Sequence, residues 1–320
     1  MLVAKRFSSL LAMTALVGVA LGGSPAHATD DYPGVVAQQE GATRLEPSTP
    51  WNLDFGEDKC RLTRLFGSEE DRHLVFIEQS APGRPFGLTL AGSSLNRFVS
   101  ANRLDLGMQE DMEMQRLPRF NAGEVAGIGP AVILSSVSLE KTSVASVQSL
   151  NSGAQETPSG DQARLSTVGV DIEEAAKIDR IVLRRGSRAL SFETGNLGPI
   201  MEALNTCTFD LLNEWGLNPE QHRSYTAPRW TNQLSIVRRI MATYPRRAII
   251  RGEQAIFRMR VIVEADGSVS ECVIAAATET ERLDSPACRE MMEARFEPAL
   301  DSEGNPMRSF YATSITYAID

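Results

Sequence analysis

The strongest constraint on the fold of this chain is a pattern of alternating side chains near its C-terminal end. Apolar residues occupy every second position there, namely Phe257, Met259, Val261 and Val263. Because successive side chains of a strand point to opposite faces of a sheet, the pattern predicts a half-buried strand. Asp266 and Gly267 favour a turn into a second strand over residues 269–275. A third alternating run covers residues 309–319, so the sequence predicts an antiparallel sheet.

Two helices are expected beside these strands. The first covers residues 231–243, with one apolar face made of Leu234, Val237 and Met241. The second begins at Ser285 and Pro286, which suit an N-cap and a first helical position, and runs to about residue 296. The predicted order is therefore helix, strand, strand, helix, strand.

Further residues of this region form groups in register with that order. They are Tyr244, Pro245, Ala248 and Gly252; Asp266, Gly267 and Val269; Leu283 and Asp284; Arg295, Phe296, Pro298 and Ala299; and Gly304, Asn305 and Pro306. Together they resemble the C-terminal domain of TonB-type energy transducers over residues 236–320. The resemblance implies a three-stranded antiparallel sheet with helices on one face, in a protein of the Gram-negative periplasm.

The resemblance also implies a site. In transducers this domain captures an extended segment of an outer-membrane transporter by adding it as a strand to an exposed edge, where unpaired N–H and C=O groups can bond to it. The corresponding edge residues here are Tyr244, Pro245, Tyr311, Thr313, Ile315 and Tyr317. Two alternatives stay open: the edge is covered or only solvated, or it pairs with a second copy of the chain.

The first residues indicate export. Lys5 and Arg6 precede an apolar run over residues 10–21, and a small-residue triplet ends at Ala28, as in a cleavable secretory signal. We therefore expect a signal peptide over residues 1–28, a periplasmic mature chain and no membrane span after cleavage. A transducer needs a retained membrane helix and a long extended spacer, so a standard energy transducer is not expected.

The chain as a whole is expected to be α+β, with a separate β-rich domain before the TonB-like segment. Residues 29–50 are polar and Pro-containing, which predicts a flexible leader. Residues 51–216 carry short strand-like runs between Gly, Pro, Asn and Asp clusters, which favours a β-rich sandwich or barrel-like domain closed by a helix. Residues 217–230 then form the expected linker, and residues 231–320 the TonB-like domain. The sequence assigns no function to the β-rich domain.

All cysteines of the chain, Cys60, Cys207, Cys272 and Cys288, follow the signal segment, and an oxidising compartment favours disulfides. Three pairings are possible. We expect Cys60 with Cys207 and Cys272 with Cys288, because each bridge then staples a separate domain. Cys207 falls on the apolar stripe of the closing helix, which supports this pairing. The alternative is a set of free buried thiols.

Other chemistry finds little support in the sequence. The net charge of −9 makes nucleic acid a poor partner. His73 and His222 stand alone without metal-ligand spacing, and the Ser138-x-x-Lys141 match lacks its companion motifs. We assign no catalytic residue, metal or cofactor. A hydrolase in the N-terminal domain remains an alternative, because acidic pairs formed by folding are invisible in a sequence.

The sequence thus predicts a non-catalytic periplasmic protein that captures a peptide or protein segment of the cell envelope, such as part of an outer-membrane transporter, by strand addition. The principal alternative is an envelope structural or assembly protein that dimerises through the same edge strand.

Overall fold

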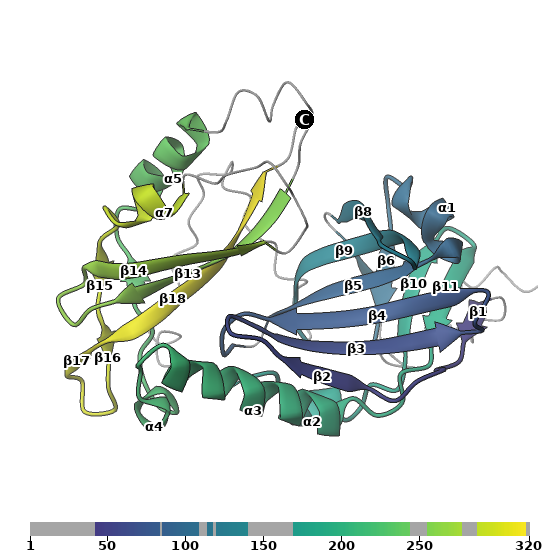
Figure 1. Ribbon diagram of the computed structural model, residues 1–320, viewed down its shortest axis with the longest axis horizontal. Coiled ribbons are helices and arrows are strands. Elements are labelled where there is room, and N and C mark those ends of the chain that lie inside the picture. The colour runs from purple at the N-terminus through teal and green to yellow at the C-terminus, as the bar shows by residue number, and fades with distance from the viewer. Residues whose placement is uncertain are drawn as a thin grey trace, which may run out of the picture. The chain divides into compact units, whose positions relative to one another are not determined.

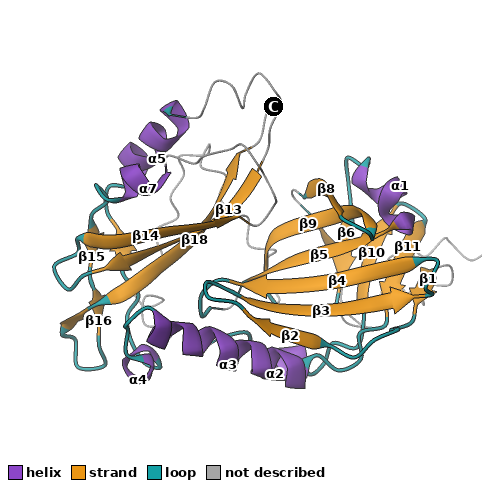
Figure 2. Cartoon of the chain, viewed as in Figure 1, coloured by secondary structure: helices purple, strands orange, loops and turns teal. Residues whose placement is uncertain are grey.

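The computed structural model describes residues 42–83, 85–108, 114–117, 120–139, 169–243, 255–276 and 287–317 (Figure 1). The described part of the chain is α+β and rich in strands, as expected (Figure 2). We call residues 42–217 the N-terminal module and residues 229–317 the C-terminal module.

The N-terminal module contains two open sheets. The first has six antiparallel strands in the order β2 (Asn52–Phe55), β3 (Cys60–Gly67), β4 (Arg72–Gln79), β5 (Phe86–Gly92), β9 (Gly129–Val137) and β8 (Asn121–Val125). The second has the order β1 (Ala42–Leu45), β11 (Arg188–Phe192), β10 (Ile181–Arg185), β6 (Asp105–Gly107) and β7 (Gln115–Arg116).

Both sheets contribute to one hydrophobic core, which agrees with the expected β-rich sandwich. Val75 and Ile77 of β4 are fully buried in it because alternate residues of the strand face inward. Phe66 of β3 meets Phe192 of β11 edge to face, with ring centroids 5.4 Å apart. The opposite, outer face of the six-stranded sheet carries a second, smaller apolar cluster that includes Leu74, Phe76 and Ile133.

Short helical segments accompany the sheets, namely η1 (Ser93–Leu95), α1 (Asn96–Val99) and α2 (Ile172–Ala175). The long helix α3 (Gly198–Glu214) packs its apolar stripe into the shared core through Met201, Leu204 and Leu211. Gly216 follows with a φ of 65°, a conformation that favours glycine and ends the helix where the sequence predicts.

The predicted leader and linker differ from the structure. Residues 42–45 form β1, which pairs in parallel with β11 and buries Leu45, so the last part of the expected leader belongs to the sandwich. The expected linker contains α4 (Pro219–His222) and buries both His222 and Tyr225. In each case backbone pairing and apolar burial fix a segment whose composition alone suggests flexibility.

The C-terminal module is built on the antiparallel sheet that the sequence predicts. Its strands are ordered β14 (Val269–Ala276), β13 (Ala255–Val263) and β18 (Ser309–Tyr317). Two short ladders flank them: β12 (Arg229–Trp230) with β15 (Phe296–Glu297), and β16 (Ala299–Leu300) with β17 (Pro306–Met307). Helices α5 (Gln233–Ala242) and α7 (Ala287–Met291) share a hydrophobic core with one face of the sheet.

The helix predictions need two corrections. The buried residues of α5 are Ile236, Val237 and Ile240, whereas Leu234 and Met241 are exposed, so the predicted apolar face was wrong except at Val237. The helix expected to run to about residue 296 ends at Met291. Its last residues instead extend into β15, where Phe296 pairs with Trp230.

Candidate partner-binding edge

β18 lies at one edge of the three-stranded sheet (Figure 2). Its whole length, Ser309–Tyr317, is paired antiparallel with β13. Among the described residues no strand pairs with its other edge. That edge therefore presents backbone groups of the kind that an added strand can use.

The opposite edge of the sheet is formed by β14. The Cys272–Cys288 disulfide joins β14 to the beginning of α7, with Cα atoms 5.4 Å apart. The second disulfide, Cys60–Cys207, joins β3 to α3. Both bridges have the pairing expected from the sequence, and the first ties a helix to β14.

The side chains predicted for the edge do not all point to a partner. Ile315 is buried in the core shared with α5 and α7. The ring of Tyr311 lies 5.2 Å from Phe296 and 5.7 Å from Trp230, and burial raises the pKa of its hydroxyl, which a hydrogen bond with Thr313 partly offsets. These side chains stabilise the strand, so capture would rest on their backbone groups.

The remaining predicted edge residues can be placed only in part. Thr313 lies in the middle of β18, opposite Met259, and Tyr317 pairs with Ala255 at its end. Tyr244 and Pro245 lie outside the described residues.

The other face of the same sheet carries arginines that the sequence predicts to be solvated and that the structure buries. Phe310 and Ile262 are buried in the core of the N-terminal module, and the ring of Phe310 lies 5.5 Å from that of Trp215. Arg258 and Arg260 of β13 share this face, and each is only 8% exposed. Because the two arginines alternate with apolar residues, the local pattern predicts that they face solvent, and it does not predict their burial.

The two arginines are held by charged groups of both modules. The Nη1 atom of Arg258 donates to the Ser135 carbonyl at 2.7 Å, and its Nη2 lies 3.4 Å from the Glu78 carboxylate. Burial lowers the pKa of Arg258, and Glu78 opposes that shift. Arg260 lies 4.1 Å from the ring centroid of Trp215, and burial lowers its pKa against the attraction of Asp58 and Glu271.

A buried histidine fixes the start of β18. The Nε2 atom of His222 lies 3.0 Å from the Ser309 hydroxyl, and Nδ1 lies 2.7 Å from the carbonyl of Asn218. Burial lowers the pKa of His222, which favours a neutral ring. A serine beside a histidine can form a nucleophile and its base, but both residues are buried, Ser309 fully, and a substrate could not reach them.

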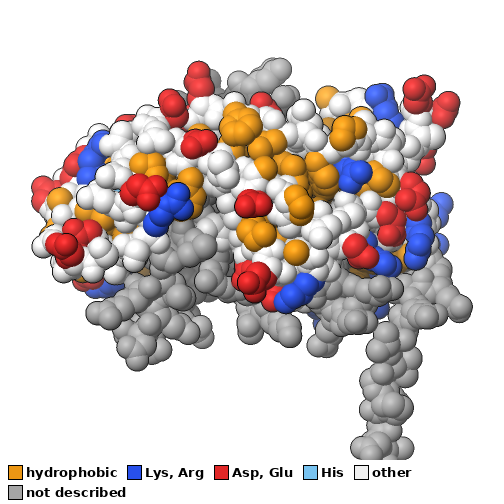
Figure 3. All heavy atoms as spheres, turned by 90° about the horizontal axis from the view of Figure 1, so that it is seen from below, with side chains coloured by type: hydrophobic (Ala, Val, Ile, Leu, Met, Phe, Trp, Pro, Cys, Tyr) orange, Lys and Arg blue, Asp and Glu red, His pale blue; other side chains and the backbone are white. Residues whose placement is uncertain are grey.

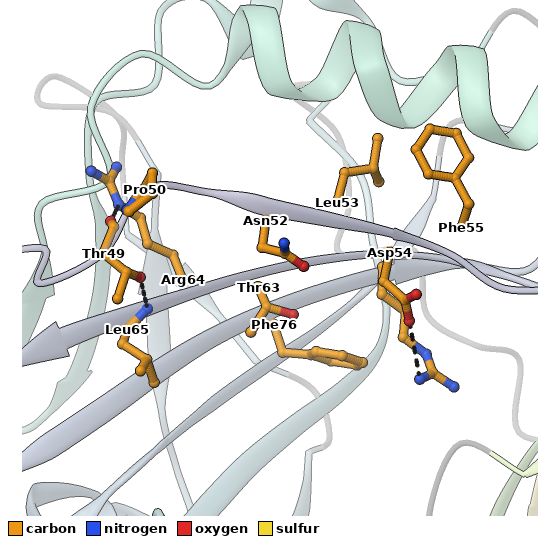
Figure 4. Close-up of a pocket in the computed structure, with 11 residues that line it drawn as sticks. Thr49, Pro50, Asn52, Leu53, Asp54, Phe55, Thr63, Arg64, Leu65 and Phe76 are labelled. Carbon is orange, nitrogen blue, oxygen red and sulfur yellow. Dashed lines mark hydrogen bonds and ion pairs between the residues drawn. The ribbon is translucent and has the colours of Figure 1, made fainter.

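An open concavity of about 710 Å³ lies on the six-stranded sheet (Figure 4). Thr63, Leu65 and Phe76 line it beside the edge strand β2. Its carboxylate, Asp54, is paired with Arg61 at 3.5 Å. The lining thus mixes apolar and polar side chains, and its one carboxylate is paired.

The charged and metal-ligating side chains in the described part of the chain bear on the binding of metals and polyanions. No group of three His, Cys, Asp or Glu side chains there could hold a metal ion. On the face shown in Figure 3, acidic and basic side chains are interspersed with apolar ones. Lys141, the second residue of the Ser-x-x-Lys match, lies outside the described residues.

Comparison with known proteins bears on the C-terminal module. Residues 241–319 match the family model described as Gram-negative bacterial TonB protein C-terminal. No curated protein matches the chain. No helix within the described ranges is long and apolar enough to cross a membrane. The domain indicates an envelope protein with protein partners, and the resemblance seen in the sequence is confirmed: residues 241–319 of this chain form a domain of the TonB C-terminal family.

Proposed function

We propose that this protein is a periplasmic, non-catalytic binding protein that captures an extended segment of an envelope protein by adding it as a strand to β18. One observation carries the proposal: β18 has a strand neighbour on one side only among the described residues. Backbone hydrogen bonds along such an edge supply affinity with little dependence on side chains. An outer-membrane transporter segment is the partner class that the family suggests.

The family resemblance favours the β18 edge over the β14 edge, which among the described residues also has a strand neighbour on one side only. β18 runs over Ser309–Tyr317. A strand of this length can pair with a comparable stretch of extended peptide.

The location in the periplasm rests on the signal segment at residues 1–28. The family match adds that the domain occurs in envelope proteins of Gram-negative bacteria. Both disulfides agree with an oxidising compartment.

A matched pair of proline substitutions tests strand addition. Successive amides of a strand point to opposite edges, so Ala312→Pro and Thr313→Pro remove one N–H that faces β13 and one that faces outward. The proline that removes the N–H facing β13 breaks a hydrogen bond of the sheet and lowers the melting temperature more than the other proline does. The proline that removes the outward N–H keeps the fold and removes a hydrogen bond to the captured strand.

The assay combines cross-linking in the periplasm, identification of the cross-linked protein and hydrogen exchange of β18 amides with that protein bound. Strand addition predicts slower exchange along β18 and weaker capture by the variant that keeps its melting temperature. If that folded variant captures its partner as well as the unaltered protein does, the β18 edge is not the contact.

The same edge also fits a second copy of the chain, which would make the protein an envelope assembly component. Light scattering over a range of protein concentrations separates the two proposals, because pairing through β18 makes the molar mass rise with concentration. A monomer at every concentration excludes the dimer and leaves capture of another protein.

A further inference from the structure

We infer that the N-terminal module is the permanent docking partner of the TonB-like domain, and that Arg258 and Arg260 hold the two modules together. This inference goes beyond strand capture, because it concerns the face of the sheet rather than its edge. It also gives the N-terminal module a role, which is to mount the domain that carries the edge.

The docking face is defined by alternation along β13 and β18. Phe257, Met259 and Val261 point to the core shared with α5 and α7. The intervening residues face the other way, and Ile262 is fully buried there with Phe310. A sheet face left to solvent does not bury its apolar and charged residues together, so this face is built for a neighbour.

The socket for Arg258 is formed by three strands of the six-stranded sheet. Glu78 of β4 supplies the counter-charge and Ser135 of β9 supplies a carbonyl acceptor. Gly87 of β5 supplies space, because a Cβ atom added there would lie 2.3 Å from Nη2 of Arg258. Gly87 does not have a positive φ, so the backbone does not require glycine at this position. The missing side chain leaves room for the guanidinium.

Arg260 makes an independent set of contacts with the N-terminal module. Its guanidinium lies over Trp215, the residue that follows α3, and its Nη1 atom is 3.6 Å from the Asp58 carboxylate. Such a cation–π contact is stronger when the pair is desolvated. Apolar contacts between Phe310 and Trp215 adjoin this site.

Buried charges explain why the docking has one orientation. A guanidinium removed from water without its partners is strongly unfavourable, so a placement of the modules that leaves Arg258 buried and unpaired is disfavoured. The N-terminal module therefore covers the second face of the TonB-like sheet, and partners are left with the edges of the sheet.

The test uses the full mature chain and variants that act on the socket. Gly87→Ala fills the space beside Arg258. Alanine suits a strand better than glycine does, so strand propensity does not explain a loss of docking in this variant. Gly83→Ala is the matched control, because the nearest atom to its added Cβ, in Pro85, is 3.8 Å away. Glu78→Gln removes the counter-charge without changing the shape of the side chain.

Small-angle X-ray scattering and hydrogen exchange give the readouts. Docking predicts that Gly87→Ala and Glu78→Gln increase the radius of gyration and speed exchange in both β9 and β13, while Gly83→Ala changes neither. A radius of gyration equal to that of the unaltered protein in both socket variants overturns the inference, whatever their melting temperatures. Capture through β18 is measured separately, so docking and strand addition can fail independently.

Discussion

The ion pair between Arg258 and Glu78 provides the sharpest test of how the two modules are stabilised. Glu78 is 6% exposed and lies 3.4 Å from Arg258 and 3.6 Å from Lys59. In Glu78→Gln the docked state buries the guanidinium without its carboxylate, so that state is destabilised. Removal of one partner of a buried pair costs about 3–5 kcal/mol, and we expect about 3 kcal/mol here because Arg258 keeps its hydrogen bonds to Ser135 and Ser314.

Urea denaturation of the full mature chain measures this change in the free energy of unfolding. The loss is expected to persist at high salt, because buried pairs are poorly screened. Adding Arg258→Gln removes the unpaired charge, so the double variant is expected to lose less than the sum of the single variants, by about 0.5–3 kcal/mol.

An exposed ion pair supplies the control. Arg229 and Glu297 interact across β12 and β15, and both side chains are more than half exposed. Glu297→Gln is therefore expected to leave the urea midpoint almost unchanged. Equal effects of Glu78→Gln and Glu297→Gln would refute the reasoning that burial makes the first pair indispensable.

Three further outcomes follow from the structure. Replacing the Cys60–Cys207 bridge by alanines is expected to lower the free energy of unfolding by about 5 kcal/mol, and replacing Cys272–Cys288 by about 3 kcal/mol. The first bridge costs more because its ends are 147 residues apart, against 16 for the second. Urea titrations without reductant measure both losses, and the reverse order contradicts the chain-entropy account. Burial lowers the pKa of His222 from its ordinary 6.5, so the unfolded chain takes up the proton first and stability falls as the pH decreases below that value. Melting temperatures measured from pH 8 to pH 5 check this. An equal pH dependence in His222→Gln would contradict it. Ile315→Ala is expected to cost about 2–4 kcal/mol, since the side chain is buried in the C-terminal core, whereas the half-buried Thr313→Ala is expected to cost less in the same titration.

Local periodicity was sufficient to predict the sheet of the C-terminal module. The period of two along Phe257–Val263 arises because alternate residues pack into the apolar core shared with α5 and α7, and the Asp266–Gly267 turn sets the next strand. The cysteine pairing was also predicted, because Cys207 lies on the apolar stripe of α3 and can reach β3.

Long-range pairing could not be predicted in the same way. Arg258 and Glu78 are 180 positions apart. An arginine between apolar residues is therefore predicted to face solvent, because local sequence does not show its distant partner. The strand β1 shows the same limit, because its four residues are fixed by pairing with β11 and by the burial of Leu45. The apolar face of α5 was misplaced because this short helix offers two overlapping apolar stripes, and Val237 belongs to both.

The two-sided burial of the TonB-like sheet restricts how this domain can be reused. A chimera that joins residues 231–320 to a foreign N-terminal half would carry Ile262, Phe310 and two arginines shaped for a neighbour that is missing. Such a graft would be expected to aggregate unless those positions were first made polar, so in this chain the two halves are constrained to evolve as a pair.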